Sequence, residues 1–332
     1  MINQNNSLKK KAALISMIVG LGMFAAKITA YLLTGSSAIF SDAAESVVHV
    51  LATGMALYSI ILSAKPADKS HLYGHGNIEY FSAGVEGLLI VLAAMVIIYS
   101  SVSDLITGFR PEKLDIGTII VGIAGAVNLW LGLYLIKKGK QTKSLALVAD
   151  GKHVLTDSYT SIGVVIGLIL VLITGFYIID PLMAIFVALN ILYTGYKLVR
   201  ESIGGLMNET DEDTLSGIVE TLNSIRKISW IDIHHLKFWK SSNKIFVDFH
   251  LILPYYFTIQ QSHLEENFIE ESFNEKLGEA QVRIHMDYCS TNLCKYCDYI
   301  DCTVRLEDKS ININWDQEKM IGEPVVVSGH IT

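Results

Sequence analysis

Six long apolar stretches constrain the fold of this 332-residue chain more than any other feature of its sequence. They cover about residues 12–34, 38–63, 78–106, 116–136, 146–174 and 179–203. Since about 20 apolar residues in a helix cross the hydrocarbon layer of a bilayer, each stretch is long enough for one span. Only 18% of the residues are charged, against about 25% in a typical soluble domain. The sequence therefore predicts an α-helical membrane domain of six transmembrane helices over residues 1–206.

Basic residues fall almost entirely in alternate loops. On one side of the membrane these are Lys9, Lys10, Lys11, Lys65, Lys69, Lys137, Lys138, Lys140, Lys143, Lys197 and Arg200. The other side has only Arg110 and Lys113. Because loops rich in Lys and Arg stay inside the cell, both termini are expected to be cytoplasmic. The first run is too long for a signal peptide and no cleavage site follows it, so a multi-pass protein of a cell inner (plasma) membrane is expected.

The pattern changes after residue 206. Residues 211–226 and 260–277 have helical spacing, whereas 231–239, 244–253 and 280–286 read as strands. This order predicts a small cytoplasmic α+β domain over residues 207–288, followed by a Cys-rich extension over residues 289–332. The net charge of −7, with no basic patch, argues against a nucleic acid as partner.

Two of the apolar stretches contain the same pattern of ionisable residues. Asp42, Glu45 and His49 in the second stretch have the spacing of Asp150, His153 and Asp157 in the fifth. Positions i, i+3 and i+7 share one helix face, so each helix presents a polar stripe. Charged side chains in a bilayer are costly and commonly functional. Together Glu45, His49, His153 and Asp157 would provide a tetrahedral nitrogen and oxygen site suited to Zn²⁺, or to Fe²⁺, Co²⁺ or Mn²⁺.

The alternative for these residues is a set of hydrogen bonds that join membrane helices without any metal. Two parallel stripes with one spacing favour the metal site. The remaining polar residues of the apolar stretches are isolated and fit packing or hydration roles; they are Lys27, Glu86, Asn128 and Asn190.

With these motifs, the chain resembles the cation diffusion facilitator family. Six spans, cytoplasmic termini, a C-terminal α+β domain and a ligand pair on each of spans two and five are all similar to that family. The loop His71-Leu72-Tyr73-Gly74-His75-Gly76 resembles its loop signature. The resemblance covers about residues 8–288.

The resemblance implies specific ligand positions. The family pair on span five matches His153 and Asp157, whereas the span-two pair, usually Asp or His followed by Asp, is here Glu45 and His49. Asp68, His71 and His75 fall where some members bind a metal in the loop; otherwise this loop would simply cap a helix. The C-terminal domain is expected to be metallochaperone-like, with a metal site at a dimer interface. Its ligands would be His234, His250, His263, His285 and Asp287, unless these histidines are exposed by chance.

All four cysteines lie in one segment, in the order Cys289, Cys294, Cys297 and Cys302. A cytoplasmic location argues against disulfides. Four thiolates around a central Cys-x-x-Cys suit zinc or, with less weight, an iron–sulfur cluster. A redox-active pair and an unstructured tail with reactive thiols are the other interpretations.

The sequence thus predicts a secondary transporter rather than an enzyme. We expect a homodimer in membrane lipid that exports a divalent metal, Zn²⁺ before iron, cobalt, manganese or cadmium, in exchange for protons. Zn²⁺ is expected as both substrate and regulator. A membrane-bound metal sensor is the alternative; desaturase boxes and the His-Glu-x-x-His string of zinc proteases do not occur in the sequence.

Overall fold

The computed structural model describes residues 2–142, 145–242 and 244–326. Within these ranges some side chains also lie outside the description, among them those of His49 and His153. The chain forms two compact units, one of residues 1–59 and 81–202 and the other of residues 60–80 and 203–332.

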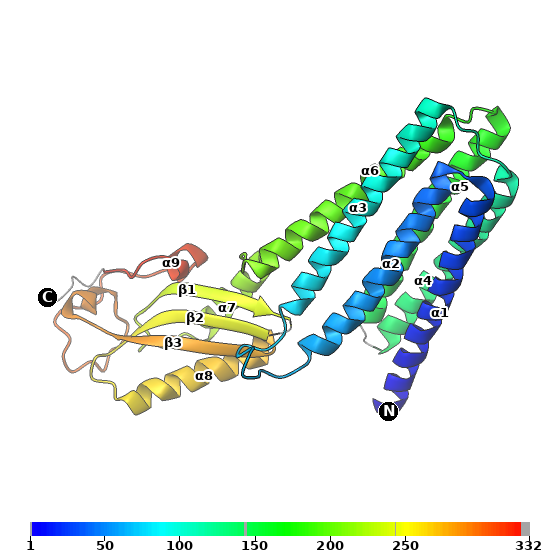
Figure 1. Ribbon diagram of the computed structural model, residues 1–332. Coiled ribbons are helices and arrows are strands. Elements are labelled where there is room, and N and C mark those ends of the chain that lie inside the picture. The colour runs from blue at the N-terminus through cyan, green and yellow to red at the C-terminus, as the bar shows by residue number, and fades with distance from the viewer. Residues whose placement is uncertain (1, 143–144, 243, 327–332) are drawn as a thin grey trace. The chain divides into compact units, whose positions relative to one another are not determined.

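The first unit is a bundle of long helices (Figure 1). Their bounds are α1 Ile2–Thr34, α2 Ser37–Ser63, α3 Ile78–Thr107, α4 Leu114–Thr142, α5 Leu145–Thr174 and α6 Ile179–Leu206. Within the described residues, five of these helices are long and apolar enough to cross a membrane. The sixth, α2, has 27 residues and carries Glu45 and His49. The predicted helical membrane domain is confirmed.

Small residues allow these helices to approach closely. A Cβ atom on Gly87 of α3 would lie 2.9 Å from the Val199 nitrogen and 3.0 Å from the Gly195 oxygen of α6. Gly132 of α4 and Gly151 of α5 meet in the same way, because a Cβ on either would lie 2.9 Å from the carbonyl oxygen of the other. Such contacts are typical of membrane helices, whose association depends on close packing. They fix α3 against α6 and α4 against α5.

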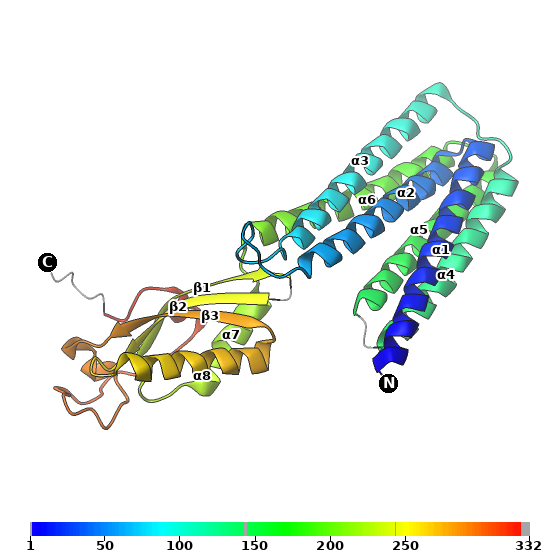
Figure 2. The same ribbon diagram turned by 60° about the horizontal axis from the view of Figure 1, so that its bottom comes forward.

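The second unit contains the predicted α+β domain. Its elements are α7 Glu212–Ile225, β1 Asp232–Ser241, β2 Lys244–Leu253, α8 Ile259–Leu277 and β3 Ala280–Tyr288. The sheet has the order β1-β2-β3, with β1 antiparallel and β3 parallel to β2. Helices α7 and α8 cover one face (Figure 2), where Leu222 and Phe273 pack against Val247 and Phe249.

The described part of the segment after β3 is packed on the α+β domain. A short helical turn, Thr291–Tyr296, and helix α9, Gln317–Ile321, belong to the same compact unit as the sheet. Trp315 and Met320 are buried in the core beside α7 and the strands. The segment therefore packs on the domain through Trp315 and Met320, which complete its core.

Candidate metal sites

A small cavity in the helical bundle is lined by two of the predicted transport ligands. Glu45 of α2 and Asp157 of α5 border a space of about 90 Å³. The Thr160 hydroxyl donates a hydrogen bond of 3.1 Å to Glu45 Oε2. Asp157 is only 6% exposed. The other two predicted ligands, His49 and His153, have side chains outside the described part of the structure. The cavity can offer a cation two carboxylates from neighbouring helices.

Two polar residues for which we expected only packing or hydration roles lie in the same lining. Glu86 of α3 and Asn190 of α6 face this cavity, together with Thr156 and Thr194. The sequence marks each only as a polar residue within an apolar stretch. Because neither has the spacing of the two stripes, only the packing of α3 and α6 brings them to the carboxylates.

Lys27 is buried in the same helical bundle. Its Nζ lies 2.9 Å from Asp42 Oδ1 and 3.2 Å from the Ser161 hydroxyl, which itself donates to Asp42 Oδ1 over 2.6 Å. Lys27 and Asp42 are each 1% exposed. The isolated lysine of the sequence is thus half of a buried ion pair that joins α1, α2 and α5.

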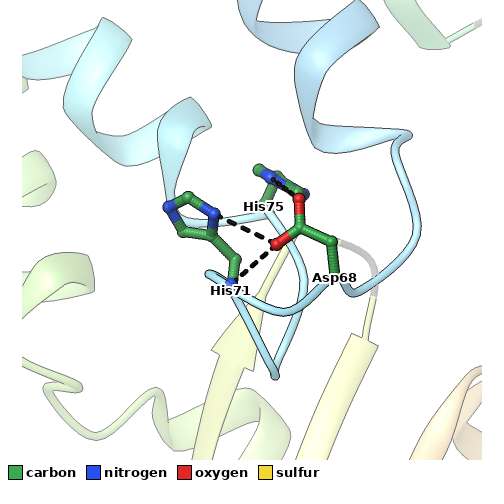
Figure 3. Close-up of side chains that lie close together, drawn as sticks. All are labelled: Asp68, His71 and His75. Atoms are coloured by element: carbon green, nitrogen blue, oxygen red, sulfur yellow. Dashed lines mark hydrogen bonds and ion pairs between the residues drawn. The ribbon is translucent and has the colours of Figure 1, made fainter.

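The predicted loop site brings its three residues together (Figure 3). His71 Nδ1 lies 3.6 Å from Asp68 Oδ1, and His75 Nε2 lies 3.4 Å from Asp68 Oδ2. One donor atom from each of the three residues lies within 4.8 Å of the others. The backbone N–H groups of His71 and Ser70 hydrogen-bond the exposed Asp68 carboxylate and lower its pKa. The carboxylate is therefore ready to bind a cation.

The three strands of the cytoplasmic domain align three predicted histidines. In the sheet His234 pairs with His250, and His250 pairs with His285. Asp287 Oδ2 lies 2.9 Å from His250 Nδ1 and 3.5 Å from His234 Nε2, so these three residues form a compact donor group. The His285 ring stacks on that of His250 at 4.5 Å.

His263 of α8 does not belong to that compact group. It is exposed and its Nδ1 lies 3.3 Å from Glu266 Oε2. It nevertheless lines a surface pocket to which Asp287 also contributes. The structure thus places His263 near one of the predicted ligands without adding it to the donor set.

His235 corrects one expectation from strand alternation. Its neighbour His234 faces the site, so a regular strand would turn His235 to the other face. Instead the His235 ring lies 4.9 Å from the His234 ring and 5.2 Å from the His250 ring. The register shifts between His234 and Lys237, and His235 has a φ of 55°. This bulge re-aims the side chain toward the site.

The cysteines are free thiols that lie in one region after β3. Cys297 is buried against Ile231 and Leu293, and the Tyr299 N–H donates a hydrogen bond of 3.4 Å to its sulfur. Cys289 interacts electrostatically with the other three, and burial raises its pKa. In the residues that the structure describes, no three of the sulfurs lie within 4.8 Å of one another. The segment would have to contract to form a tetrahedral site.

Comparisons with known proteins agree with this geometry. The cation efflux transmembrane domain matches residues 13–207, and the cytoplasmic domain of cation efflux proteins matches residues 210–289. The chain belongs to the cation diffusion facilitator family. It is therefore a multi-pass transporter of divalent metal cations rather than an enzyme.

Three relatives illustrate the range of proteins to which this chain is similar. An uncharacterized transporter of Synechocystis sp. is 34% identical over 280 residues, which cover 84% of this chain and 90% of the relative. The cadmium, cobalt and zinc/H(+)-K(+) antiporter of Bacillus subtilis is 28% identical over 86% of this chain and 91% of its own. The magnetosome protein MamB of Paramagnetospirillum magneticum is 32% identical over 55% of this chain and 62% of its own.

The low pKa of His234 predicts that the free energy of unfolding of this protein falls in acid. Burial, and secondarily the nearby His250, lower the pKa of His234 to about 4, from an ordinary value of 6.5. The unfolded chain therefore binds an extra proton between these values, and stability should fall as the pH drops from about 6.5 to about 4, by at most about 3 kcal/mol. Thermal unfolding of the metal-free protein across this range measures it. His234→Gln should flatten the profile, whereas the exposed His263→Gln should not.

Proposed function

We propose that this protein exports Zn²⁺ from the cytoplasm in exchange for protons, as a homodimer in a cell inner membrane. The observation that carries the proposal is the cavity between α2 and α5, where Glu45 and Asp157 converge within a bundle of the cation efflux type. The match of residues 210–289 to the cytoplasmic domain of the family supports a dimer and a cytoplasmic location for the C-terminal domain.

The exchange follows from the acid–base chemistry of the ligands. Carboxylates bind a metal when ionised and imidazoles when neutral, so metal entry releases protons. We assign His49 and His153 as the two nitrogen ligands beside Glu45 and Asp157. When the cavity opens to the side with the higher proton activity, the histidines take up protons and the metal leaves. Movement of the helices between two arrangements then returns the protonated protein.

We assign the histidine group of the cytoplasmic domain, and the loop group Asp68, His71 and His75, to regulation. Cytosolic Zn²⁺ that binds one arrangement of the protein more tightly than the other shifts the population by that difference in affinity. The ligands that we assign to the cytoplasmic site are His234, His250, His285 and Asp287, and His263 of α8 lines a pocket beside Asp287. Mixed imidazole and carboxylate donors favour Zn²⁺ over Mn²⁺.

Metal uptake by the purified protein in proteoliposomes tests the transport proposal. An acidic lumen should drive Zn²⁺ inward in whichever orientation the protein inserts, because proton efflux then drives metal uptake. A protonophore should abolish this Zn²⁺ uptake, because it dissipates the pH gradient. Uptake that does not respond to the pH gradient would contradict proton exchange, and absence of any uptake would favour a metal sensor.

The same vesicles determine the metal and the counter-ion. Competition among Zn²⁺, Fe²⁺, Mn²⁺, Co²⁺ and Cd²⁺ ranks the substrates, and we expect Zn²⁺ to compete best. A relative is named for exchange with both H⁺ and K⁺. A K⁺ gradient imposed at constant pH shows whether K⁺ also moves.

The four cysteines are assigned as a further zinc site in the cytoplasm. Their spacing and the N–H···S hydrogen bond to Cys297 support this assignment. By elemental analysis, the Cys294→Ser/Cys297→Ser variant should then contain one zinc equivalent less than the full-length protein, whereas Leu306→Ala, at an exposed residue of the same segment, should lose none. Iron with acid-labile sulfide would indicate a cluster instead, and equal zinc in both variants would contradict the site.

A further inference from the structure

A buried lysine within the metal-transporting bundle requires an explanation. Lys27 is 1% exposed and lies in α1 with its ammonium group on Asp42 and Ser161. A buried ion pair is weak evidence for stability, because taking both charges out of water costs about as much as their attraction returns. In a membrane helix such a pair indicates function.

The ion pair lies next to the proposed transport ligands. Asp42 precedes Glu45 by three residues in α2, and Ser161 follows Asp157 by four in α5, so each is one helical turn from a ligand. The Lys27 ammonium interacts electrostatically with Glu45 and Asp157 as well as with Asp42. Its charge therefore acts on any cation that those carboxylates hold.

Asp42 is not fully satisfied by this pairing. Lys27 and Ser161 both contact its Oδ1, whereas Oδ2 is buried and has no hydrogen-bond partner in the described part of the bundle. The second oxygen thus adds negative potential to the interior without a compensating donor. The pair thus places two opposed charges next to the transport ligands Glu45 and Asp157.

We propose that Lys27 and Asp42 are positioning residues whose opposite charges together set the metal affinity of the transport cavity. Lys27 weakens binding of the divalent cation and Asp42 strengthens it, while neither ligates the metal. Transport requires binding that is strong enough for entry and weak enough for release. This inference rests on the proposed function, in which Glu45 and Asp157 hold the metal.

The test is the apparent KM for Cd²⁺ or Zn²⁺ uptake into proteoliposomes. Asp42→Asn keeps the size and hydrogen bonds of the side chain but leaves Lys27 uncompensated, so KM should rise at least about tenfold. Lys27→Met should lower KM and also lower the maximal rate, because release becomes slow. The double variant removes both charges and should return KM to within about threefold of the wild type.

An exposed ion pair in the same unit provides the matched control. Lys197 and Glu201 of α6 lie 3.7 Å apart, and their side chains are 67% and 62% exposed. Lys197→Met and Glu201→Gln make the same charge changes away from the cavity and should leave KM unchanged.

A purely structural pair would give a different result. The single variants would then lower the unfolding temperature without a change in KM, or the double variant would be as impaired as Asp42→Asn; either result overturns the proposal. If Lys27→Met does not fold, Asp42→Asn and the double variant still decide, because both avoid an unpaired buried carboxylate. Absence of wild-type uptake would instead refute the proposed function itself.

Discussion

Asp157→Asn is expected to reduce metal uptake into proteoliposomes by about a hundredfold or more. The substitution keeps the shape of a side chain that is 6% exposed and borders the cavity with Glu45. It removes one negative charge that a buried divalent cation needs, and loss of one partner from a buried charge pair typically costs about 3–5 kcal/mol. Initial rates at saturating and subsaturating Zn²⁺ measure the effect.

Asp115→Asn is the matched control for this experiment. Asp115 lies in the first turn of α4, is exposed and does not line the cavity. The same chemical change there should leave the uptake rate within about twofold of the wild type. Retained uptake with an unchanged KM in Asp157→Asn would contradict the assignment of the site. Glu86, which lines the same cavity, would then be the next ligand to test.

The outline of the fold could be predicted because its signals are local. Runs of apolar residues indicated the membrane helices, and the bounds of α7, α8 and the three strands differ from the predicted ones by at most two residues. The family resemblance implied that His234 and His250 belong to one site, and the register places them opposite each other. The bulge at His235 depends on a backbone conformation with positive φ that its sequence context does not encode.

The partners of isolated polar residues could not be predicted. Lys27 contacts Asp42, 15 residues away in the next helix, and Ser161, 134 residues away. Periodicity within one helix says nothing about such contacts, because they depend on which helices pack together. Glu86 and Asn190 reach the cavity for the same reason.

The packing of the segment after β3 could not be predicted from the sequence either. Residues 303–326 have no sustained period, yet Trp315 is only 2% exposed. The Arg226 guanidinium lies 4.0 Å from the centroid of the Trp315 ring, and the side chain of Asn223 in α7 donates a hydrogen bond of 2.8 Å to the Trp315 carbonyl oxygen. A single anchor residue of this kind leaves no pattern that a window along the chain can detect.

Trp315→Ala should therefore destabilise the cytoplasmic domain strongly. Truncation of a buried Trp typically costs about 3–5 kcal/mol, because apolar burial is lost and a cavity remains. Hydrogen exchange on the intact protein should show about a hundredfold or greater loss of amide protection in α7 and β1. The amides of α4 should keep their protection.

Leu306→Ala is the control in the same segment, since Leu306 is 72% exposed and its truncation should leave exchange in α7 unchanged. Unchanged protection in Trp315→Ala would show that the segment contributes nothing to the core. The expected loss would mean that the stable unit of this transporter extends beyond residue 289, where the match to the family's cytoplasmic domain ends. The four cysteines would then lie in a loop that is fixed at both ends, by β3 on one side and by Trp315 on the other. Because β3 also carries His285 and Asp287, metal binding by the cysteines would change the position of the strand that holds two of the assigned ligands.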